Sequence, residues 1–175
     1  MTDFISKLNE KAQKLKERNF FHAGATQEEI EQFEQKLKIT LPPVLKTFYA
    51  NFNGGCFADD SWSKEDLENS EMKEGIIWNS NYFLSLQEMI KAYQYEGDFI
   101  SFDIQELEKG TGKRFIPILH TKEQEVLVWE ASNPNETPIK DAYHDINPNK
   151  WKVLYPSFES LINAYIHEDG EIETV

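Results

Sequence analysis

The sequence predicts an α+β fold: a single domain in which an antiparallel β-sheet is flanked by N-terminal helices and a C-terminal helix. Helical patterns fill the first and last parts of the chain, while short β-branched and aromatic segments lie between them. The length of 175 residues suits one domain with a single core. A content of 39% hydrophobic and 13% aromatic residues is too apolar for a disordered chain. We therefore expect one domain over residues 1–175.

The first segment, residues 3–18, has the pattern of an amphipathic helix. Phe4, Leu8, Ala12 and Leu15 fall on one helical face, and most of the lysines fall off it. We expect this helix to pack on the domain through its apolar face and to leave a solvated, lysine-rich face outside.

A second helix is predicted to start at a capping box. Thr26 and Glu29 have the spacing in which the threonine hydroxyl accepts one free N–H and the glutamate covers another. Ile30, Phe33 and Leu37 follow as the stripe that should face the core.

The segment ITLPPVLKTFYANFNGG, residues 39–55, predicts a third helix. Pro42 and Pro43 suit a helix start, and Asn53 and Gly54 suit its end because they tolerate the left-handed conformation. A phosphate-binding loop would place its glycines before a helix and add a Lys-Ser/Thr pair, which is absent here. We therefore interpret the segment as structural, with an apolar face made by Leu45, Phe48, Tyr49 and Phe52.

Two more helices are expected further along the chain. Ser85 and Glu88 form a second capping box, which predicts a helix from Leu86 to about Tyr95. Ser157 should start the last helix, and the apolar residues that follow it should face inward.

Four segments have the composition of strands. These are GIIWN (75–79), RFIPIL (114–119), EVLVWEA (125–131) and PIKDAYHD (138–145). Residues 120–124 are short enough to join the second and third segments as an antiparallel hairpin. Pro117 cannot donate to a strand ladder, so its strand should lie at an edge or carry a bulge.

The overall charge narrows the range of partners. Acids outnumber bases by 31 to 18, which gives a net charge of −13. This charge opposes binding to nucleic acid and to anionic membranes, and it attracts basic proteins. Cys56 is the single cysteine, no span is apolar enough for a membrane, and the N-terminus lacks a signal-peptide pattern. We expect a cytoplasmic protein.

Motifs for catalysis or metal binding are weak. The four histidines are isolated, with no spacing that would place two ligands on one metal. There is no Gly-x-Ser-x-Gly elbow, and Cys56, the best single nucleophile candidate, is more typical of a small buried side chain. We predict a non-enzymatic protein with no cofactor and no metal.

One stretch, residues 59–74, is strongly acidic. It holds seven acids and two lysines, a net five negative charges, with Trp62 among them. Such a run is usually a solvated loop or an exposed short helix, but an aromatic residue among acids is also typical of a protein interface. The candidate contact residues are Asp59, Asp60, Trp62, Glu65, Asp66, Glu68, Glu71 and Glu74. A second candidate surface is formed by the tail acids Glu168, Asp169, Glu171 and Glu173.

The segment ATQEEIEQFEQKLKITLPPVLKTFYANFNGG, residues 25–55, resembles the N-terminal signature of the SMI1/KNR4 family, within the SUKH superfamily. Its members typically have T-x-x-E-I-x-x-F-E, then L-x-L-P, then an aromatic-rich helix that ends in N-G-G. A weaker likeness continues in order through FLSLQEMIKAY, FIPIL and YPSFESLINAYI. The positions that match the signature are Thr26, Glu29, Ile30, Phe33, Glu34, Leu37, Leu41, Pro42, Lys46, Phe48, Asn53, Gly54 and Gly55.

This resemblance implies a non-enzymatic α+β domain. In bacteria such a protein is typically an immunity protein that binds and neutralises a cognate toxin, often a nuclease or a deaminase. Nuclease toxins carry basic clefts, so an acidic partner suits them. We therefore expect an immunity protein against a basic, nuclease-like toxin. The alternatives are a regulatory scaffold that binds a cytoplasmic protein, as in fungal relatives, and a hydrolase that uses acids near Cys56.

Overall fold

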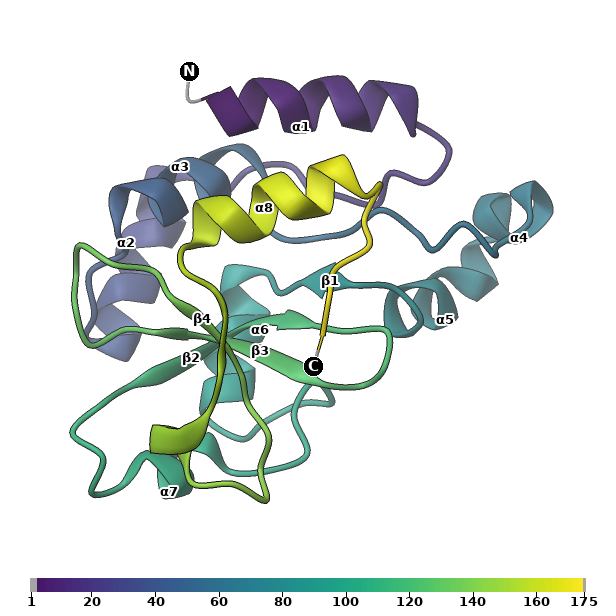
Figure 1. Cartoon of the computed structure of the whole chain (residues 1–175). Coiled ribbons are helices and arrows are strands. Elements are labelled where there is room, and N and C mark those ends of the chain that lie inside the picture. Colours follow the sequence, from purple (N-terminus) through teal and green to yellow (C-terminus); the bar gives the residue numbers. More distant parts are fainter. Residues whose placement is uncertain (1–2, 175) are drawn as a thin grey trace.

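The computed structural model describes residues 3–174 and confirms the α+β fold (Figure 1). Residues 1–2 and 175 of the predicted domain lie outside the described part. A five-stranded sheet forms the centre, in the order β1-β2-β3-β4-β5, with every neighbouring pair antiparallel. The strands are β1 (Tyr82–Phe83), β2 (Phe115–His120), β3 (Val126–Glu130), β4 (Ile139–Asp141) and β5 (Val153–Tyr155).

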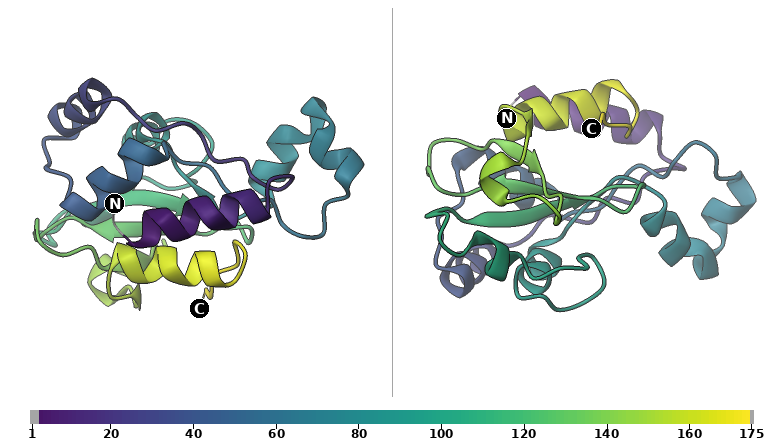
Figure 2. Two further views of the ribbon diagram at one scale, coloured as in Figure 1. Left: turned by 90° about the horizontal axis from the view of Figure 1, so that it is seen from above. Right: turned by 60° about the horizontal axis from the view of Figure 1, so that its bottom comes forward.

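Helices lie on both sides of this sheet. Helices α1 and α8 pack against each other over one face, and α6 packs against the other face and against α2 (Figures 1 and 2). The α-helices are α1 (Asp3–Lys14), α2 (Gln27–Leu37), α3 (Pro43–Asn51), α4 (Lys64–Glu68), α5 (Lys73–Trp78), α6 (Leu86–Tyr93), α7 (Ile104–Glu108) and α8 (Phe158–His167), and the short 3₁₀ helices are η1 (Ser70–Met72) and η2 (Pro148–Lys150).

The predicted helix starts are confirmed by their caps. Thr26 and Ser85 each accept a hydrogen bond from the backbone N–H three residues on, and Glu29 and Glu88 return to the cap backbone. Ser157 caps α8 in the same way, with Ser160 as its partner. The first helix is shorter than predicted, because its helical bonds end at Lys14 and turns continue from there. The fourth predicted helix, α6, ends at Tyr93, two residues early.

The predicted strand at residues 75–79 is wrong. This segment lies mainly in α5, where Ile76 faces inward and the residues around it are partly exposed. A short apolar run does not by itself separate a strand from a helix turn, and here the preceding η1 leads directly into helical geometry.

The hairpin between β2 and β3 is confirmed, and so is the bulge at Pro117. Strand β2 lies between β1 and β3, so the edge-strand alternative is wrong. The register shifts between Pro117 and Leu119 instead. The bulge accommodates a residue that has no N–H to donate.

Asn53 and Gly54 do not cap α3 as predicted. The helix ends at Asn51, and Phe52, at the cap position, is extended. Gly54 and Gly55 have φ values of 78° and 115°, and they let three backbone segments cross closely. Gly55 and Phe83 exchange backbone hydrogen bonds of 2.8 and 2.9 Å, while a Cβ on Gly55 would lie 2.4 Å from Phe21 Cα. Gly54 and Gly55 therefore lie where the backbone of β1 and the backbone of residues 20–21 pass close to the segment after α3.

The core between the sheet and α8 is aromatic. Phe48, Phe83 and Phe158 contact one another with ring centroids 5.1 to 6.0 Å apart. The buried Tyr165 hydroxyl accepts a 2.7 Å hydrogen bond from Phe57 N and donates to Asn81 O. These contacts fix the backbone on both sides of residues 59–78.

Candidate functional site

Residues 59–78, which we call the acidic lobe, project from the body of the molecule (Figures 1 and 2). The acidic lobe consists of a loop followed by α4, η1 and α5. The candidate residues Asp60, Glu65, Glu68, Glu71 and Glu74 are exposed on it. The sequence-predicted acids therefore lie on one protruding part of the surface.

Asp59 is different because it anchors the root of the acidic lobe. Its carboxylate pairs with Lys122 at 3.1 Å, and Lys122 also pairs with Glu171 at 2.6 Å. Burial opposes ionisation of Asp59, but hydrogen bonds from Ser61 and the Lys122 ammonium hold its pKa well below the usual value. Asp59 and Glu171 are thus used inside the molecule.

Trp62 and Asp66 also serve the lobe itself. A Cβ on Gly75 would lie 3.8 Å from Trp62 Cη2, which places the half-buried indole against α5. Within residues 3–174, the buried Trp62 Nε1 has no hydrogen-bond partner. Asp66 accepts a 2.6 Å hydrogen bond from the Ser63 hydroxyl, which caps α4. Both residues stabilise the lobe, and their side chains are only partly free for a partner.

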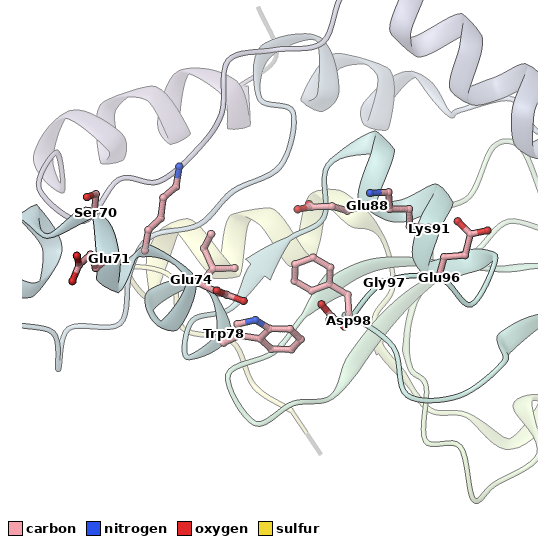
Figure 3. Close-up of a pocket in the computed structure, with 12 residues that line it drawn as sticks. Ser70, Glu71, Glu74, Trp78, Glu88, Lys91, Glu96, Gly97 and Asp98 are labelled. Atoms are coloured by element: carbon pink, nitrogen blue, oxygen red, sulfur yellow. The ribbon is translucent and has the colours of Figure 1, made fainter.

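A groove runs between the acidic lobe and the body (Figure 3). Its volume is about 530 Å³. Glu71 and Glu74 lie on the lobe side, and Glu96 and Asp98 lie on the opposite side, with Trp78 between them. The residues that line it are Ser70, Glu71, Lys73, Glu74, Ile77, Trp78, Glu88, Lys91, Glu96, Gly97, Asp98 and Phe99.

Two rings of an aromatic stack, Trp78 and Phe99, line this groove, and we call this lining its aromatic floor. Phe99 lies between Trp78 and Tyr82, with centroid distances of 5.3 and 5.5 Å and nearly parallel rings. His120 meets Trp78 edge to face at 4.7 Å and is only 2% exposed. The stack brings the loop 96–99 next to α5. Sequence reasoning found Glu71 and Glu74 but missed Glu88, Glu96 and Asp98, because no local pattern connects these segments.

Burial lowers the pKa of His120 to about 4. Its Nδ1 atom has no hydrogen-bond partner among the described residues. Because the folded state disfavours the charged ring, the unfolded chain takes up a proton first when the pH falls below about 6.5. We therefore expect the free energy of unfolding to decrease by up to about 3 kcal/mol as the pH is lowered from 6.5 to 4.

Urea unfolding at a series of pH values tests this expectation. In His120→Phe the decline between pH 6.5 and pH 4 should flatten, whereas the exposed His167→Gln should keep it. An equal slope in His120→Phe and the wild type would contradict the assignment to His120.

Cys56 and metal ligands offer little chemistry. Burial raises the pKa of the Cys56 thiol to about 12, so the thiol stays protonated near neutral pH. The prediction of a small buried side chain is confirmed.

Between residues 3 and 174, no three His, Cys, Asp or Glu side chains are arranged to hold a metal ion. No helix in that range has the length and apolar character needed to cross a bilayer.

The fold and the groove define a small α+β domain that presents acids over an aromatic floor. The chain belongs to the SMI1 / KNR4 family (SUKH-1), whose model matches residues 24–164, from just before α2 into α8. The resemblance seen in residues 25–55 is therefore confirmed. This family includes immunity proteins and is typically non-enzymatic. A comparison with curated proteins finds no match.

Proposed function

We propose that this protein is a cytoplasmic immunity protein that binds and neutralises a cognate toxin with a basic, nuclease-like surface. Family membership supports the class of function, and the net charge of −13 supports the charge of the partner. The protein acts by occupying the toxin, and its own residues perform no catalysis.

The observation that carries this proposal is the state of the acids on the acidic lobe. Asp60, Glu65, Glu71 and Glu74 are exposed, and within residues 3–174 their carboxylates have no ion-pair or hydrogen-bond partner. Uncompensated like charges repel one another, and a basic partner relieves that repulsion. The lobe therefore favours a positively charged surface.

The tail acids fit this role less well. Asp169 pairs with Lys11, Glu171 pairs with Lys122, and Glu168 contacts His167. Two of the four tail acids, Asp169 and Glu171, are therefore compensated by lysines inside the molecule. This difference favours the acidic lobe over the tail as the toxin-binding surface.

The test uses the toxin encoded beside this protein's gene, co-expressed with the protein in a sensitive host. Wild-type protein should protect the cells. The variant Glu65→Lys/Glu71→Lys/Glu74→Lys should lose protection, and its association rate should fall at least tenfold at low salt. The matched control Glu10→Lys/Glu28→Lys/Glu136→Lys makes the same change in charge at scattered exposed positions and should still protect.

Two outcomes would overturn the proposal. If the bound partner is a non-toxic cytoplasmic protein, the scaffold alternative replaces it. If the lobe and control variants protect equally well, the lobe is not the binding surface.

A further inference from the structure

We propose that the groove between the acidic lobe and the loop 96–99 binds arginine side chains of the partner. This inference rests on the proposed function for the identity of the partner, but the site has its own chemistry. It adds Glu88, Glu96, Asp98, Trp78 and Phe99 to the surface predicted from residues 59–74.

The first argument is the balance of charge in the groove. Five acids line it, against Lys73 and Lys91. Within residues 3–174, the carboxylates of the exposed Glu71, Glu74, Glu96 and Asp98 accept no hydrogen bond and have no cation within 4 Å. The ammonium groups of the two lysines have no ion-pair partner either. By contrast, Glu34 and Glu130 on the body are paired with lysines. The groove is therefore short of cations.

The second argument is the floor. Ile77, Trp78 and Phe99 are partly exposed and line the groove together with the carboxylates. A small inorganic cation gains nothing from an apolar floor. A long basic side chain can lay its methylene stem on such a surface and carry its charged end to the carboxylates. Arginine suits this arrangement better than lysine, since its planar group stacks on aromatic rings and binds carboxylates in a forked geometry.

The third argument is that one wall is held in place before binding. The Tyr82 hydroxyl donates to the Glu88 carboxylate at 3.0 Å, and the same carboxylate accepts a 2.7 Å bond from Ser85 N. Phe99 is held between Trp78 and Tyr82. A fixed wall lowers the ordering cost of binding.

The size of the groove fits a short segment. The groove volume of about 530 Å³ lies within the roughly 300–1,000 Å³ range of typical ligand sites. This volume is larger than one ion needs. An occupant would touch both the lobe and the body. We expect a basic segment of the toxin to place two or more arginine side chains there.

The probe is a blocked peptide of sequence Arg-Gly-Arg, with the matching citrulline peptide as an uncharged isostere. In amide and indole NMR spectra, the arginine peptide should shift the Trp78 indole signal and residues 96–99, with weak, saturable binding. The citrulline peptide should bind at least tenfold more weakly. The indole signal is assigned with Trp78→Phe.

Variants locate the site. Glu96→Gln/Asp98→Asn should weaken peptide binding at least fivefold, while Glu10→Gln/Glu28→Gln should leave it unchanged. Equal binding of both peptides, no detectable binding of the arginine peptide, or shifts confined to other surfaces would overturn the inference.

The same variants separate this inference from the proposed function. If Glu96→Gln/Asp98→Asn keeps full toxin affinity and the wild-type protein protects the cells, the groove inference fails and the immunity proposal stands. If the arginine peptide binds in the groove but the wild-type protein gives no protection, the immunity proposal fails and the site remains.

Discussion

Replacing Gly55 with alanine is expected to lower the free energy of unfolding by about 3 kcal/mol or more. Two costs combine at this position. The φ value of 115° is strained for any residue with a Cβ. The new Cβ would also lie 2.4 Å from Phe21 Cα and 2.5 Å from Phe20 O, both in the backbone, so no side-chain rotation relieves the clash. Denaturant unfolding measures the loss.

Two other glycines separate these costs. Gly110 has a φ value of 78°, but a Cβ there meets nothing within 4 Å, so Gly110→Ala should cost only about 1 kcal/mol. Gly24 has no positive φ, yet its Cβ would lie 2.0 Å from Ala50 O, so Gly24→Ala should also be strongly destabilising. If Gly55→Ala loses no more unfolding free energy than Gly110→Ala, the backbone around residue 55 can move to admit a Cβ at little cost in free energy.

Glu130→Gln is expected to cost about 3 kcal/mol, because it leaves a buried ammonium without its counter-charge. Lys140 is only 6% exposed, and its Nζ pairs with Glu130, which also pairs with Lys113 at 3.2 Å. Burial opposes ionisation of Glu130, but hydrogen bonds from Lys140 and Lys113 lower its pKa below 4.5. Thermal or urea unfolding at pH 7 measures the change.

A double variant and a pH series provide the controls. Glu130→Gln/Lys140→Met removes both charges and should recover most of the loss, since a neutral pair needs no compensation. The stability that Glu130 adds to the wild type is present above pH 4.5 and is lost as the pH falls through the lower pKa of the folded state. Glu130→Gln should lack this acid step. A single variant as stable as the wild type would mean that solvent reaches Lys140.

The parts of the fold that were predicted correctly depend on short-range signals. The caps at Thr26 and Ser85 are formed by residues three apart, so the sequence displays them directly. Strand β1 was missed because it has only two residues, and β5 because none of its three residues is buried, so neither shows a pattern. The segment 75–79 was assigned to a strand because its apolar residues are adjacent, and tertiary packing decides which way such a run folds.

The candidate site was predicted only in part for a similar reason. Glu71 and Glu74 belong to the acidic run, which is visible in the sequence. Glu96 and Asp98 join them only because Phe99 stacks between Trp78 and Tyr82, a contact between distant segments. The sequence also shows no sign that Asp59 pairs with Lys122 and Glu171, which removes two acids from the candidate surfaces.

The ammonium of Lys122 connects the acidic lobe to the C-terminal segment. It pairs with Asp59 at the root of the acidic lobe and with Glu171 in the segment after α8. Asn81 adds a second link, because its side chain donates to Gly170 O and accepts a hydrogen bond from Lys122 N. The root of the lobe is therefore tied to the C-terminal segment through the loop between β2 and β3. A displacement of the lobe would in this way also be felt at Glu171, more than a hundred positions beyond Asp59 in the chain.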